Sequence, residues 1–311
     1  MKNSFVVPHL IAETLSSIKM KSRELKTYHK TLSELNNSFT HYNFIWEQFR
    51  IDYLEKIDLS SDKRMTTEVF KENEVVETHQ ISMNKLEDEH LKTKSTLYEG
   101  IYVLIFTYFE NYLKSLMKFA IKVDGSLISI DSPITEDKPD KILIDKFFNR
   151  IGINKSEPND ELIVTLDYLR LKRNRLIHKN SESISRSLRT LINGSGNNLN
   201  KYWNKRLPKS LQGIDFSSSE NANNINWNIL IDTINSMKGI TFDIDELIIN
   251  KLSKRNIFNQ VVLPEYLSKL KGRAKATNIE KLIGSFERFS MTEYGLAIDD
   301  EMRNDIKSSV A

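Results

Sequence analysis

Apolar side chains recur at helical spacing along most of this chain, with lysine, glutamate and asparagine between them. The clearest pattern covers residues 84–122, where Leu97, Ile101, Leu104, Ile105 and Tyr108 begin a wide apolar stripe. Similar patterns predict further helices over about 9–57, 141–151, 160–179, 227–254, 264–271 and 278–289. We therefore expect a mainly α-helical protein with long N-terminal helices.

Four stretches depart from this pattern. Two short runs rich in β-branched residues surround a polar turn and predict a small β-hairpin near 66–81, with a helix as the alternative. Asn193–Asn198 and Ser217–Asn224 have the composition of flexible linkers, and we expect the tail after Asp299 to be frayed.

Composition narrows the class of protein. The 311 residues hold no cysteine, which excludes disulfides and cysteine-based metal or redox chemistry. Phe5-Val6-Val7 is too short for the apolar core of a signal peptide, and no apolar run reaches the length of a membrane span. We therefore expect a cytoplasmic protein with no membrane association. The net charge of +3 does not by itself predict a nucleic-acid partner.

The end of the predicted helix 160–179 combines residue types that few other stretches bring together. Arg173-Asn174-Arg175-Leu176-Ile177-His178 places Asn174 and His178 four residues apart, on one face of a helix. Positive charge is concentrated around it, with a single acid, Glu182, between 169 and 189. The basic residues of this stretch are Arg170, Lys172, Arg173, Arg175, Lys179, Arg186 and Arg189. Such a patch can follow a phosphate backbone.

These side chains meet the demands of RNA cleavage without a metal. A histidine can take the proton of the ribose 2′-hydroxyl or protonate the leaving 5′-oxygen near neutral pH. An arginine presents a planar fork to the phosphoryl oxygens as charge develops on them. The sequence therefore makes His178 a candidate general acid or base, Arg173 a candidate phosphate ligand and Asn174 a candidate orienting residue. Arg170, Lys172, Arg175 and Lys179 are candidate RNA-binding residues.

The Arg173-Asn174-x3-His178 pattern resembles the Arg-x4–6-His signature of the HEPN superfamily of helical ribonucleases. An earlier helix with an acidic residue in an aromatic setting, Tyr108-Phe109-Glu110-Asn111-Tyr112, is also similar to that family. The resemblance covers about residues 84–180 and, extended to 250, implies an N-terminal helical segment (1–83), a HEPN-like helical domain (84–250) and a C-terminal helical segment (251–311). It implies a helical bundle over 84–250 that forms a homodimer, a composite site needing no cofactor or metal, and a toxin or antiphage (abortive infection) role with an antitoxin or other defence-system partner.

Other interpretations remain open from the residues alone. His178 can be a helix-capping residue without chemistry. Glu110 can lie in water at the edge of its stripe, or it can meet a cation from another helix; in the dimer we expect it to pair with Arg173 or Arg175, as the counter-charge of the catalytic site. The whole chain can also be a catalytically inactive helical adaptor that binds RNA or a partner protein.

Overall fold

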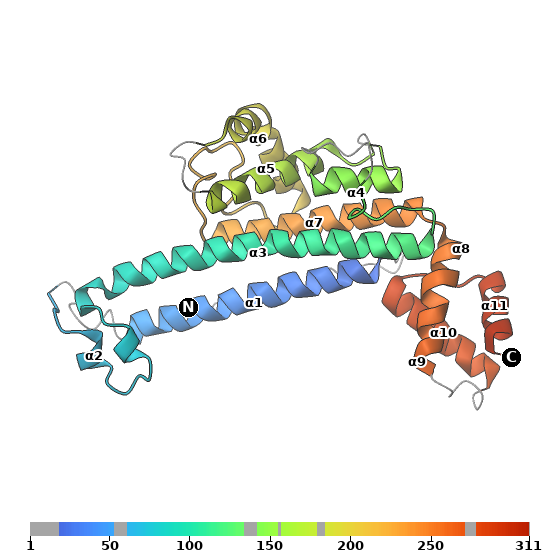
Figure 1. The fold of residues 1–311 in the computed structure, drawn as a ribbon, viewed down its shortest axis with the longest axis horizontal. Coiled ribbons are helices and arrows are strands. Elements are labelled where there is room, and N and C mark those ends of the chain that lie inside the picture. Colours follow the sequence, from blue (N-terminus) through green and yellow to red (C-terminus); the bar gives the residue numbers. More distant parts are fainter. Residues whose placement is uncertain are drawn as a thin grey trace. The chain divides into compact units, whose positions relative to one another are not determined.

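The regular structure of this protein is helical throughout the part that is described (Figure 1). The computed structural model describes residues 19–52, 61–133, 142–154, 157–178, 184–270 and 278–310. Their long helices are α1 (Arg23–Asp52), α3 (Leu86–Val123), α5 (Asp160–Ile177), α6 (Arg186–Arg206), α7 (Trp227–Lys251) and α10 (Ile279–Tyr294). The shorter elements are α2 (Thr66–Val69), η2 (Val76–Thr78), η3 (Met83–Lys85), α4 (Leu143–Ile151), α8 (Lys254–Ile257), the π-helix η4 (Phe258–Val262), α9 (Leu263–Leu270) and α11 (Asp300–Val310). The prediction of a mainly α-helical protein is confirmed.

The described residues fall into two compact units. Unit 1 takes those of 1–26, 113–154 and 242–311, and unit 2 takes those of 27–112 and 155–241. The boundary between the units lies within α1, α3 and α7. None of the helices in the described ranges has the length and apolar character needed to cross a membrane.

In unit 2, the α1 helix runs antiparallel to α3 and α7. Tyr98 on α3 donates a hydrogen bond to Asn43 on α1 at 2.5 Å, whereas Tyr28, at the other end of α1, stacks on Tyr112 of α3. Phe39 packs edge-on against Trp227 of α7. Tyr112 also donates to the Thr241 carbonyl of α7 at 3.2 Å, so the aromatic face of α3 is buried against both α1 and α7, which explains why its apolar stripe is wide rather than narrow.

The α5–α6 pair packs onto the same unit through one buried tryptophan. Trp203 of α6 donates from Nε1 to Thr165 Oγ1 of α5 at 2.8 Å and is 1% exposed. Its ring also lies over Gly239 of α7, where a Cβ atom would come within 3.1 Å of it. Tyr102 of α3 donates to the Leu169 carbonyl of α5 at 3.1 Å. These contacts fix the helix that carries the Arg-Asn-x3-His pattern.

Unit 1 is organised by polar contacts that reach its buried interior. The carboxylate of Asp245 accepts hydrogen bonds from the backbone N–H and the hydroxyl of Ser22, and all three groups are buried. The tail after Asp299, predicted to be frayed, is instead the helix α11, with Met302 and Ile306 buried. Its apolar residues are spaced four apart, and this spacing buries one face of the helix.

The predicted hairpin near 66–81 is wrong. This segment forms α2, η2 and a single isolated bridge between Met65 and Ser82, and no strand occurs in the described residues. The carboxylate of Glu68 accepts from the Met65 backbone N–H at 2.8 Å and closes the first turn of α2. Local capping of this kind favours a helical turn, and the polar stretch between the two runs lacks the glycine that a tight hairpin turn favours.

The predicted linker at 193–198 is also wrong, because these residues lie inside α6. Gly196 faces the chain at 216–217, and a Cβ atom there would lie 2.6 Å from the Phe216 carbonyl oxygen. Glycine here permits a close backbone approach within a helix rather than flexibility. The second linker, Ser217–Asn224, is a series of turns that contacts α5.

Candidate functional site

The helix that carries the candidate residues has well-defined ends. Asn159 is its N-cap, with the side chain accepting from the Glu161 N–H at 2.8 Å, and Asp160 and Glu161 place negative charge at the positive end of the helix dipole. At the other end His178 is the C-cap residue, and its N–H donates to the Asn174 carbonyl at 3.0 Å. The predicted helix over 160–179 is confirmed to within two residues.

Arg173 and His178 differ in their surroundings. His178 is exposed, so its imidazole can meet a ligand in solvent. Arg173 follows the buried Leu169 by four residues and precedes the buried Leu176 by three, so it lies on the core-facing side of α5. Its Nε is buried and makes no hydrogen bond with any described residue. Buried donors without an acceptor are rare, and an ion or ligand that supplies the acceptor is one explanation.

The remaining candidate residues differ in whether their side chains already have partners within the protein. The Asn174 side chain is half-buried, and within the described ranges no hydrogen bond to it occurs. Arg170 forms an ion pair with Asp167 of the same helix at 2.5 Å, and Arg175 donates from Nε to Asn223 Oδ1 at 3.1 Å. Lys179 lies outside the described residues. Part of the positive charge predicted from the sequence is therefore already paired within the protein.

Lys172 is buried rather than on the RNA-facing surface suggested by the sequence. It is 1% exposed, its Nζ donates to the Asn221 carbonyl at 2.6 Å, and the same nitrogen lies 5.8 Å from the centre of the Tyr102 ring. Burial lowers the pKa of Lys172 from 10.5 to about 7, because a charged ammonium loses solvation there. In this conformation Lys172 binds a backbone carbonyl and does not reach a phosphate in solvent.

The 212–223 segment, which accepts hydrogen bonds from Lys172 and Arg175, is held in place by hydrogen bonds of its own. One carboxylate oxygen of the buried Asp232 accepts from the backbone N–H groups of Gln212, Gly213 and Ile214, at 2.9, 2.7 and 2.9 Å. The Asn221 side chain donates to the Gly213 carbonyl at 2.8 Å. No local pattern in the sequence predicts the Asp232 contacts. The position of Lys172, three residues after Leu169 and four before Leu176, does indicate that this side chain faces the core.

Glu110 is not brought to the motif within one chain. It is half-buried on α3, and among the hydrogen bonds and ion pairs of the described residues none joins it to Arg173 or Arg175. It lies two turns beyond Tyr102, about 12 Å along the helix. Because α5 runs antiparallel to α3 (Figure 1), this direction leads away from His178. The pairing of Glu110 with a motif arginine across a dimer stays a prediction.

The surroundings add two findings. No group of three or more histidine, aspartate or glutamate side chains that could hold a metal ion occurs within the residues that the structure describes. Comparison of the chain with protein-family models, with characterised proteins and with solved structures finds no match. The candidate site consists of an exposed imidazole and a half-buried arginine at the C-terminal end of α5.

Proposed function

We propose that this protein is a metal-independent endoribonuclease of the HEPN type, in which the end of α5 binds and cleaves RNA. The observation that carries the proposal is the buried Arg173 Nε without an acceptor, five residues before the exposed imidazole of His178. A phosphoryl oxygen is a strong acceptor for such a donor, and the interaction is charge-assisted. An imidazole at the helix end supplies the acid or base that the 2′-hydroxyl reaction requires.

The roles of the residues follow from this chemistry. Arg173 stabilises charge on the phosphoryl oxygens, and Asn174, one turn before His178, orients either the imidazole or the phosphate. Arg170, half-exposed beside Asp167, is available to the RNA backbone at the cost of a surface ion pair, which contributes little stability. Lys172 and Arg175 act indirectly, by fixing the 212–223 segment beside the helix.

One chain offers one His178, whereas cleavage benefits from both an acid and a base. We include in the proposal a homodimer in which two copies of the motif face each other across a two-fold axis. Glu110 then supplies counter-charge to the arginines of the facing motif. Such an enzyme suits a toxin or antiphage effector that is restrained by a partner protein. Light scattering at micromolar concentration tests the dimer, and a purely monomeric species contradicts it.

A second candidate function is a helical adaptor without catalysis. It is favoured by the engagement of Lys172 and Arg175 inside the unit, which leaves fewer cations for RNA than the sequence suggests. Digestion of a mixed RNA pool, with and without a chelator, separates the two candidates. Arg173→Ala should abolish cleavage, whereas Arg303→Ala, at an exposed arginine paired with Glu287 on a different helix, should leave it unchanged. An adaptor would cleave nothing in any variant.

A further inference from the structure

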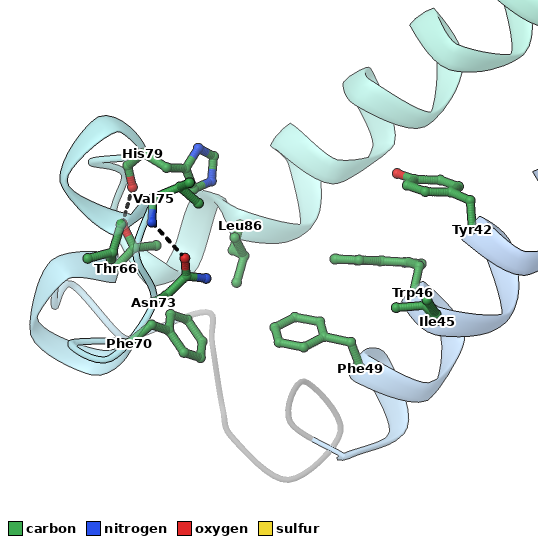
Figure 2. A pocket seen from close by; sticks show the side chains of 11 residues that line it. Tyr42, Ile45, Trp46, Phe49, Thr66, Phe70, Asn73, Val75, His79 and Leu86 are labelled. Atoms are coloured by element: carbon green, nitrogen blue, oxygen red, sulfur yellow. Dashed lines mark hydrogen bonds between the residues drawn. The ribbon is translucent and has the colours of Figure 1, made fainter.

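Unit 2 contains a cavity that plays no part in the proposed ribonuclease site. It lies where α1 and the start of α3 meet the segment of α2 and η2, and its volume is about 390 Å³ (Figure 2). Its aromatic wall consists of Tyr42, Trp46 and Phe49 on α1 and Phe70 after α2. A space of this size exceeds a packing defect and can accept a bulky side chain.

The aromatic side chains of the wall contact one another. The rings of Trp46 and Phe49 lie 5.3 Å apart, and Phe49 lies 6.1 Å from Phe70, so the three rings form one continuous surface. The imidazole of His90 stacks on Trp46. Burial lowers the pKa of His90 to about 4, so this ring is neutral near neutral pH.

The cavity has an apolar mouth, and its lining offers few polar groups that could bind a ligand. Ile45 and Val75 line it while 53% and 62% exposed, which is an unfavourable state for aliphatic side chains in water. The hydroxyl of Thr66 donates to the His79 carbonyl, and the Asn73 side-chain oxygen accepts from the Val75 N–H at 3.0 Å. These polar atoms are therefore satisfied within the wall (Figure 2). The cavity favours an apolar occupant over a polar one.

The segment that forms one side of the mouth carries negative charge. Glu72, Glu74 and Glu77 are exposed and make no ion pair within the described residues, and Lys71 is the only lysine or arginine between Met65 and Asn84. Carboxylates at this density repel a phosphate backbone, so the aromatic wall is not a platform for RNA bases. The same carboxylates attract lysine and arginine, so the surface should prefer a partner that is basic as well as apolar.

We propose that this cavity is a docking site for a segment of another protein in which a large apolar side chain stands beside lysine or arginine. The apolar side chain fills the space between Trp46, Phe70 and Val75, and the basic neighbours face Glu74 and Glu77. Burial of Ile45 and Val75 by the partner removes apolar surface from water, which is the favourable term in such binding. The inference stands independently of whether the protein cleaves RNA.

Selection from a random peptide library tests the proposal with the full-length protein. Peptides are selected on the wild type and counter-selected on Ile45→Asn, which changes an exposed position and leaves the buried core intact. The expected peptides share a large apolar residue next to lysine or arginine. Leu104→Asn, at a 40% exposed leucine of α3 that does not line the cavity, is the matched control.

Calorimetric titration of a selected peptide then measures each contribution. Ile45→Asn should weaken binding about tenfold, the double change Glu74→Lys and Glu77→Lys should weaken it several-fold at low salt, and Leu104→Asn should leave it unchanged. The proposal is overturned if no peptides distinguish wild type from Ile45→Asn. It is also overturned if the selected peptides are acidic or lack a bulky apolar residue, or if Leu104→Asn weakens binding as much as Ile45→Asn does.

Discussion

The buried ammonium of Lys172 should make the stability of this protein depend on pH in an unusual window. Burial lowers the pKa of Lys172 from 10.5 in the unfolded chain to about 7. Between these values the unfolded chain binds more protons than the folded one, so the free energy of unfolding rises as the pH increases. The rise reaches at most about 1.4 kcal/mol per pH unit for one group, which gives about 2 kcal/mol between pH 7 and pH 9.

The comparison with Lys172→Met isolates this contribution. Methionine keeps most of the length and apolar bulk of the side chain and does not titrate, so the variant should lack the additional rise. Urea unfolding followed by circular dichroism at pH 7 and pH 9 measures the difference between the two proteins. Lys201→Met, at an exposed lysine of α6, should retain the wild-type dependence. Equal pH dependence in wild type and Lys172→Met would refute the burial of a titrating ammonium beside Asn221.

Three further predictions test other parts of the structure. Gly196→Ala should destabilise the protein by about 1–3 kcal/mol in urea unfolding, because its Cβ would meet the neighbouring backbone. The control Gly194→Ala places its Cβ in open space and should stabilise the protein by about 0.5–1 kcal/mol. A change of the same sign in both variants would contradict the packing described. Asp232→Asn should cost about 2–3 kcal/mol in the same assay through weaker hydrogen bonds to three N–H groups, and an unchanged midpoint would argue against that anchor. Arg173→Lys should lower the rate of RNA cleavage about 100-fold, because an ammonium lacks the planar fork; wild-type rates would remove Arg173 from the mechanism.

Local signals in the sequence were sufficient for much of the helical architecture. The α3 stripe is long and regular, and α5 begins at a good N-cap, Asn159, and turns polar and basic at its end. Such features depend on residues a few positions apart, which the sequence displays directly. The Arg-Asn-x3-His pattern was visible for the same reason.

The predictions that were wrong depend on contacts between residues that lie far apart in the sequence. Glycine-rich composition at 193–198 suggested a linker, but Gly196 serves a close approach of the 216–217 backbone. The β-branched runs at 66–81 suggested strands, but the described residues include no strand with which they could pair, and Val76 is buried as part of the 3-10 helix η2. The sequence predicts that Lys172 is a surface cation, but its Nζ donates to the carbonyl of Asn221, 49 residues away. Tertiary context overrides propensity at each of these positions.

The central claim is that His178 and Arg173 cleave RNA without a metal, and one digestion tests it most directly. Purified wild type, His178→Ala and the control His41→Ala, which changes an exposed histidine on α1, are incubated with a defined RNA in EDTA, and the termini of the products are identified by mass spectrometry. The account predicts 2′,3′-cyclic phosphate ends from wild type and His41→Ala, and a rate lower by about 10²–10⁴-fold for His178→Ala. Equal cleavage by His178→Ala, or activity that disappears in EDTA and returns with magnesium, would contradict it.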